Sequence, residues 1–184
     1  GSFATAGLTT VNNVASWNGS SWTAMGSGMN HTVESLAVSG MTLYAGGWFT
    51  TAGSVSAKGI ARWDGGGWSA LGSGMSGSEV NIVYALAISG SSLYAGGLFP
   101  QAGGKWAGSI AKWDGTAWFS LGSGMSGSNY FPSVQSLAVS GRNLYAGGDF
   151  TKAGGGTANR IAKWNESGWS ALGSGVNSNV LALA

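Results

Sequence analysis

The sequence predicts an all-β fold built from four copies of one antiparallel, four-stranded unit. Its 184 residues include 35 Gly and 10 Trp, but only 8 Lys+Arg and 6 Asp+Glu. Plentiful aromatics and rare charges exclude a disordered chain despite the high glycine content. A tryptophan motif recurs four times, and no apolar period of the helical kind is present. Many short strands joined by tight turns explain these observations together.

The recurring motif is a pair of tryptophans separated by four residues that hold a turn. Its copies are Trp17 with Trp22, Trp63 with Trp68, Trp113 with Trp118, and Trp164 with Trp169. The first Trp recurs at intervals of 46, 50 and 51 residues. This period matches β-propeller blades of four antiparallel strands. We therefore predict a single propeller domain or propeller segment over residues 1–184, with repeat units of about 3–49, 50–99, 100–150 and 151–184.

Each unit divides into four expected strands, a to d. Strand a is the apolar run at 33–38, strand b is 43–47, strand c is 60–63 and strand d is 68–71. A Ser-Gly turn joins a to b, and an Asp-Gly or Asn-Gly turn joins c to d, since these residues tolerate positive φ. Strand a recurs at 83–88 and 134–139, and in short form at 180–184. Its small residues suit the crowded centre of a propeller, so strand a is expected to be innermost; they are Ala37, Ala87 and Ala138.

Loop lengths distinguish the two rims of the expected fold. The b–c loops keep one length, whereas the d–a loops differ from copy to copy. In a propeller these two loop types share one rim, and the other rim has only short turns. Insertions at one place per repeat mark loops on one face, which is often the binding face.

The strand count leaves two architectures open. There are four copies of a, c and d but only three of b, and the piece without a counterpart corresponds to Val38–Gly46. One possibility is a closed four-blade ring, whose last blade combines the C-terminal strand a with the N-terminal strands c and d. The other is part of a larger propeller or assembly, through self-association or further repeats. An open arc would leave strand edges and apolar faces exposed.

The repeat resembles the kelch motif. Gly46-Gly47 after an apolar strand, then Trp63-Asp64 and Trp68, carry the resemblance. The longer pattern is similar to kelch-like propellers of extracellular bacterial proteins and fungal cortical polarity markers. The resemblance implies the fold and an extracellular or cell-surface location, but it leaves function open. Galactose oxidase shares kelch architecture, and its copper chemistry needs a Tyr–Cys crosslink and His ligands. This chain has no Cys and a single His, His31.

Composition argues against several classes of partner and chemistry. The net charge is +2 and Lys/Arg runs are absent, which disfavours nucleic acid and anionic membranes. No apolar run is long enough to span a bilayer, so we expect no membrane insertion. No His/Cys cluster, calcium loop or phosphate loop appears, so no metal or cofactor is expected. The six carboxylates are scattered and His31 has no evident triad partner, so the sequence does not predict an enzyme.

Aromatic residues divide into two classes. The eight paired tryptophans repeat fourfold, so we expect them to be structural and to fill the space between blades. Four other aromatics break the repeat in the loops of one rim and are candidate ligand contacts: Trp48, Trp106, Tyr130 and Phe131. The alternative is that they cap their loops over the core. Three charged residues near the same face form either a polar recognition patch or a surface ion pair: Asp149, Lys152 and Arg160.

Two functions of different classes follow from these patterns. The first is a non-catalytic module of a secreted or surface protein that recognises a glycan or protein through loops on one rim. The second is a purely structural repeat module of a cell-envelope, adhesin or filament protein, favoured by the near-identity of the copies. A glycoside-active enzyme ranks last.

Overall fold

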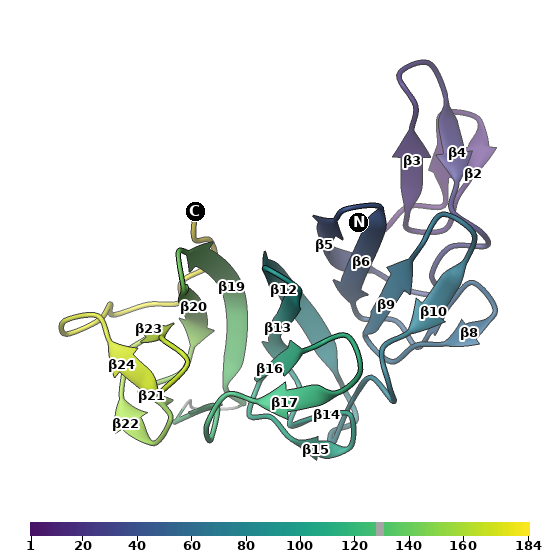
Figure 1. The fold of residues 1–184 in the computed structure, drawn as a ribbon. Helices are drawn as coiled ribbons and strands as arrows, with labels where there is room; N and C mark the ends of the chain where they lie inside the picture. The colour runs from purple at the N-terminus through teal and green to yellow at the C-terminus, as the bar shows by residue number, and fades with distance from the viewer. Residues whose placement is uncertain (128–130) are drawn as a thin grey trace.

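The protein is all-β over residues 1–127 and 131–184, the part that its computed structural model describes (Figure 1). Three four-stranded antiparallel sheets form most of it. The first contains β5 (Val33–Ser39), β6 (Thr42–Gly47), β9 (Ile60–Trp63) and β10 (Trp68–Ala70). The second contains β12 (Ile82–Ser89), β13 (Ser92–Leu98), β16 (Ile110–Trp113) and β17 (Trp118–Ser120). The third contains β19 (Ser133–Ser140), β20 (Asn143–Asp149), β23 (Ile161–Trp164) and β24 (Trp169–Ala171).

Smaller sheets complete the structure. Strands β3 (Ala15–Trp17) and β4 (Trp22–Ala24) form a separate pair that corresponds to strands c and d of the other sheets. The b–c loops fold into short hairpins that the sequence pattern did not reveal. These hairpins are β1 (Thr5–Ala6) with β2 (Thr9–Thr10), β7 (Thr51–Ala52) with β8 (Val55–Ser56), β14 (Gln101–Ala102) with β15 (Lys105–Trp106), and β21 (Lys152–Ala153) with β22 (Gly156–Thr157). Strands β11 (Met75–Ser76) and β18 (Met125–Ser126) pair with β14 and β21.

The three large sheets lie side by side in an arc (Figure 1). Strand β12 lies against both β5 and β19, so the expected a strands are neighbours from one sheet to the next. One register recurs between strands b and c: Leu43 opposite Trp63, Leu93 opposite Trp113, and Leu144 opposite Trp164. This register places the a–b and c–d turns at one edge of each sheet. We call that edge the turn rim and the opposite edge, with the b–c and d–a loops, the loop rim.

The double glycines are required by close packing. A Cβ on Gly46 would lie 2.6 Å from Cγ1 of Val83 in the next sheet. A Cβ on Gly47 would lie 2.2 Å from the carbonyl oxygen of Thr32. Both distances are impossible for real Cβ atoms, so strand b needs glycine at two successive positions. Packing between sheets, and not only within them, therefore fixes this part of the repeat.

A tryptophan joint links each unit to the one before it. The second Trp of a unit donates its indole N–H to the carbonyl oxygen at the end of the preceding strand d. The three bonds are Trp68 Nε1 to Met25 O, Trp118 Nε1 to Leu71 O, and Trp169 Nε1 to Leu121 O, each 2.8 Å. The indoles contact the glycine that follows the acceptor, as Trp118 does at Gly72. The predicted structural role holds for these pairs, which are buried or partly buried.

The first tryptophan pair departs from the prediction. Trp17 is 51% exposed and Trp22 is 42% exposed, because no other sheet of the described residues covers them. Burial of these large side chains therefore depends on a neighbouring unit and not on the motif itself.

The two ends of the chain do not meet. Across the described residues, no sheet joins β3 and β4 to segment 180–184, and Figure 1 shows them at opposite ends of the arc. The closed ring, one of the two expected architectures, is thus absent from this structure. The segment 180–184 was expected to form a short strand a, but it has no assigned strand, since no strand b pairs with it. Val180 nevertheless packs against Gly147, as Val83 does against Gly46.

Candidate binding rim

The loop rim holds the positions at which the repeats differ most. The residue after the second glycine of strand b is Trp48, Leu98 or Asp149. The residue before strand c has positive φ in every copy, and it is Asn13, Gly59, Ser109 or Arg160. Its backbone is held in place twice: for example, the Ser109 N–H donates to Phe99 O, and the Ser109 carbonyl accepts from Gly97 N–H. The same backbone thus presents a different side chain in each sheet.

An apolar cavity of about 680 Å³ opens on this rim between the loops that precede β12 and β19. Its main side chains are Val80, Leu98, Pro100, Trp106, Phe131 and Pro132. Glu79 is the one charged residue among its described lining residues. The hydroxyl of Ser109 donates to Pro132 O at 2.6 Å and ties the two sides of the cavity together. Concave, mostly apolar sites with a few polar groups are typical of ligand binding.

Two of the predicted aromatic contacts lie at this cavity. Trp106, on β15, is 60% exposed, and Phe131 is 67% exposed. The Trp106 indole N–H donates to Ser123 O at 3.2 Å, which fixes the ring while leaving much of it in solvent. The sequence-based alternative, that these aromatics only cap the core, does not describe side chains with this exposure. Tyr130, the residue before Phe131, lies outside the described residues.

The third sheet has a polar cavity at the corresponding position. It measures about 370 Å³, and its main side chains are Thr151, Asn159, Arg160, Ser174 and Asn177. Of these, Arg160 replaces Ser109 of the apolar cavity and Thr151 replaces Pro100. One scaffold position therefore presents apolar surface in one sheet and hydrogen-bonding groups in the next.

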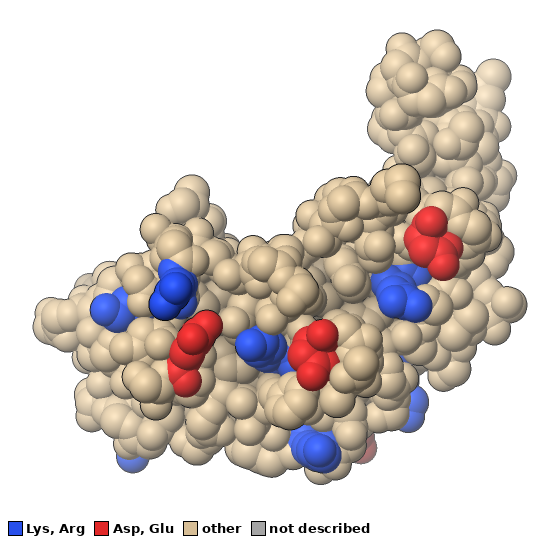
Figure 2. All heavy atoms as spheres, in the orientation of Figure 1, with Lys and Arg blue, Asp and Glu red and all other residues tan. Residues whose placement is uncertain are grey.

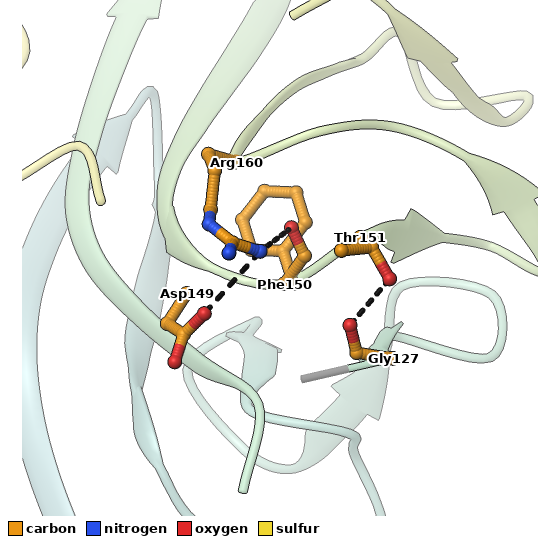
Figure 3. A network of polar contacts seen from close by, with 5 residues as sticks. All are labelled: Gly127, Asp149, Phe150, Thr151 and Arg160. Atoms are coloured by element: carbon orange, nitrogen blue, oxygen red, sulfur yellow. Dashed lines mark hydrogen bonds and ion pairs between the residues drawn. The ribbon is translucent and has the colours of Figure 1, made fainter. Parts of the chain in front are cut away.

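The charged residues predicted near this rim form an ion pair. Figure 3 shows Arg160 Nη1 directed toward Asp149 Oδ1, 3.3 Å away, and toward the carbonyl oxygen of Phe150 at 3.2 Å. Beside them the Thr151 hydroxyl donates to Gly127 O. Lys152 is exposed on β21 and lines neither cavity. The ion pair, one of the two expected arrangements, is thus formed between Asp149 and Arg160, and Arg160 also lines the polar cavity.

Trp48 lies on the same rim but away from both cavities. It is 44% exposed, and its ring centroid lies 4.2 Å from that of His31 in the d–a loop before β5. The backbone N–H of Trp48 donates to the carbonyl oxygen of Thr32 at 2.9 Å. The predicted aromatic contacts are therefore distributed: Trp106 and Phe131 share one cavity, whereas Trp48 makes a tilted ring contact, at 52°, with His31 of its own repeat unit.

The remaining surface is sparsely charged. Figure 2 shows basic and acidic side chains close to one another on the visible face rather than in a patch of one sign. The Asp side chains of the c–d turns accept hydrogen bonds from the turn backbone and so form Asx turns. Hydrogen bonds from Gly66 N–H and Gly67 N–H lower the pKa of Asp64, and bonds from Ala117 N–H and Thr116 do the same for Asp114.

The described residues contain no group of three or more His, Asp or Glu side chains that could hold a metal ion. In residues 1–127 and 131–184, no helix is long and apolar enough to cross a membrane. What the loop rim offers is apolar contact and hydrogen bonding.

Four of the six main lining side chains were missed from sequence: Val80, Leu98, Pro100 and Pro132. A detectable signal existed for one of them, because Leu98 occupies the repeat position of Trp48 and Asp149. Asking where the copies differ, rather than only where aromatics break the pattern, would have found it. Val80 and Pro132 lie in d–a loops of different length, which cannot be aligned between copies.

No family model matches this sequence, and no curated protein matches it.

Proposed function

We propose that this chain is a non-catalytic binding module that holds a glycan or protein ligand on its loop rim. The main support for this proposal is the apolar cavity flanked by the exposed rings of Trp106 and Phe131. Exposed aromatics of this kind are enriched at recognition sites, because a rigid ring provides large contact area at low entropic cost.

The wider setting of this proposal is a kelch-like β-propeller of a secreted or surface protein. The arc of four-stranded sheets with neighbouring a strands supports a propeller segment. The paired tryptophans and double glycines of the motif support the kelch-like assignment. Differences in loop length fall on the loop rim, and loops that vary on one face of a constant scaffold are how repeat folds diversify their ligands.

Two ligand classes can be separated by one experiment. The purified chain is applied to a glycan array and to a displayed random-peptide library, and any ligand found is titrated by calorimetry. We expect Trp106→Ala and Phe131→Ala each to weaken binding about fivefold or more, since a ring contact contributes roughly 1 kcal/mol. Phe119→Ala is the matched control, because this exposed aromatic lies on β17 and not on the loop rim.

Failure of both arms at high protein concentration would contradict the binding function. Equal loss from Phe119→Ala would also contradict it, since the effect would then not belong to the cavity.

A second function, a structural repeat module, is favoured by a different observation. The same tryptophan joint recurs between successive units, which suits a module whose role is to extend a regular array. An absence of ligands together with assemblies of the chain visible by electron microscopy would support this function instead.

A further inference from the structure

The apolar cavity of the loop rim has little hydrogen-bonding capacity left for a ligand. Its described lining holds three side-chain donors, and each donates to a backbone carbonyl oxygen: Ser78, Ser109 and Trp106. A hydroxyl or an indole has a single proton to donate, so these donors are already used. Pro100 and Pro132 also line the cavity, and proline has no backbone N–H.

This lining suits an apolar ligand group better than a sugar. The hydroxyls of a sugar both donate and accept hydrogen bonds, and burying them without partners costs free energy. Stacking on an aromatic ring would not provide those partners. The exposed rings of Trp106 and Phe131, together with Val80 and Leu98, instead offer contact area to a large aliphatic or aromatic side chain. Of the two ligand classes considered for this rim, a protein therefore fits the cavity better.

One charged group stands beside the apolar lining. Glu79 precedes Val80 in the loop before β12, and both residues are exposed. Among the described residues Asp149 and Arg160 form the one ion pair, so the Glu79 carboxylate has no Lys or Arg partner there. A carboxylate at the solvated edge of an apolar site favours a ligand that carries a positive charge beside its apolar group.

We propose that the apolar cavity receives one large apolar side chain from a segment of a partner protein, and that Glu79 pairs with a Lys or Arg close to that side chain in sequence. This inference rests on the proposed function and narrows its ligand to a polypeptide. A polypeptide joins a bulky apolar group and a cation a few bonds apart, as the cavity and Glu79 require. The apolar contact provides most of the affinity, and the exposed ion pair selects among apolar segments.

The test begins with a random-peptide library displayed on phage and selected against the immobilised chain. We expect the enriched peptides to share an aromatic or large aliphatic residue with a Lys or Arg near it. A fluorescein-labelled copy of the most enriched peptide is then titrated by fluorescence anisotropy. Glu79→Gln should weaken its binding about two- to fivefold at low salt, as expected for one exposed ion pair, and should reduce the salt dependence of Kd.

Charge reversal and a matched control sharpen the test. Glu79→Lys should bind the same peptide more weakly than Glu79→Gln does, and it should regain binding when the basic residue of the peptide is replaced by Glu. Glu166→Gln is the control, because this exposed carboxylate lies in the turn between β23 and β24 on the turn rim. It should leave Kd unchanged. Circular dichroism melting shows whether each variant folds.

The outcomes separate this inference from the proposed function. Enriched peptides without a basic residue would overturn the inference, as would an unchanged Kd for folded Glu79→Gln. A peptide whose binding is unaffected by Phe131→Ala would also overturn it, since that peptide would bind outside the cavity. Binding to a glycan array with no peptide selected would overturn the inference and leave the proposed function standing. Binding to neither would contradict both.

Discussion

The Trp113–Trp118 pair and the Trp17–Trp22 pair have the same local structure in different surroundings. In both pairs the ring centroids lie 5.3 Å apart with planes inclined at 52°. Yet Trp118 is 3% exposed and Trp22 is 42% exposed. The c–d hairpin alone therefore sets the ring geometry, while burial is supplied by the unit before it. Copies of one sequence motif can therefore contribute different amounts to the free energy of unfolding.

The largest expected effect tests this difference directly. Trp118→Ala should lower the free energy of unfolding by about 3–5 kcal/mol, the range for large aromatic truncations in cores. It also removes the hydrogen bond that the Trp118 indole N–H donates to Leu71 O. Trp22→Ala should cost less than about 1 kcal/mol, as most exposed positions do. Denaturant titration followed by circular dichroism, in dilute protein, measures both. Equal losses would show that the pair is stabilised within its own hairpin, and the comparison would fail.

A second prediction concerns the glycines that face the next unit. A Cβ on Gly96 would lie 2.5 Å from Cγ1 of Val134, which belongs to β19. A Cβ on Gly147 would lie at the same distance from Val180, which belongs to no strand. Gly96→Ala should cost about 1–3 kcal/mol through overpacking, and Gly147→Ala should cost less because its neighbour can move away. Matching melting-temperature losses would mean that segment 180–184 is held as firmly as a strand.

The smallest effect concerns the c–d turns and pH. The pKa values of Asp64 and Asp114 are lowered from the ordinary 3.8 by backbone N–H bonds. Each ionised carboxylate therefore stabilises the folded state fully above pH 3.8, and this contribution is lost as the pH falls through the lowered folded-state pKa. Asn18 and Asn165 make the same turn without a titrating group.

The double variant Asp64→Asn, Asp114→Asn should keep its neutral-pH fold and show a shallower loss of stability on acidification. Melting temperatures measured from neutral pH to below 3.8 check this. An unchanged acid profile would mean that other carboxylates determine acid stability.

Much of this protein was predictable because its repeat encodes local structure. Strand identities and the a–b and c–d turns depend on neighbours along the chain, and the burial of the later tryptophan pairs depends on contacts repeated from copy to copy. The loop rim was likewise predictable, since strand order fixes which loops share an edge. Trp106 and Phe131 were identified because they interrupt a pattern.

Only the tertiary structure decided the features that depend on contacts present in some copies of the repeat and absent from others. The exposure of Trp17 and Trp22, the unassigned segment 180–184 and the open arc all follow from which unit covers which, and the motif is identical in covered and uncovered copies. The contrast between the apolar cavity at Ser109 and the polar cavity at Arg160 arises in the same way. Side chains from loops of unequal length converge there, and no sequence period records that convergence. Repetition determines local geometry, whereas burial is a property of the pair of surfaces that meet.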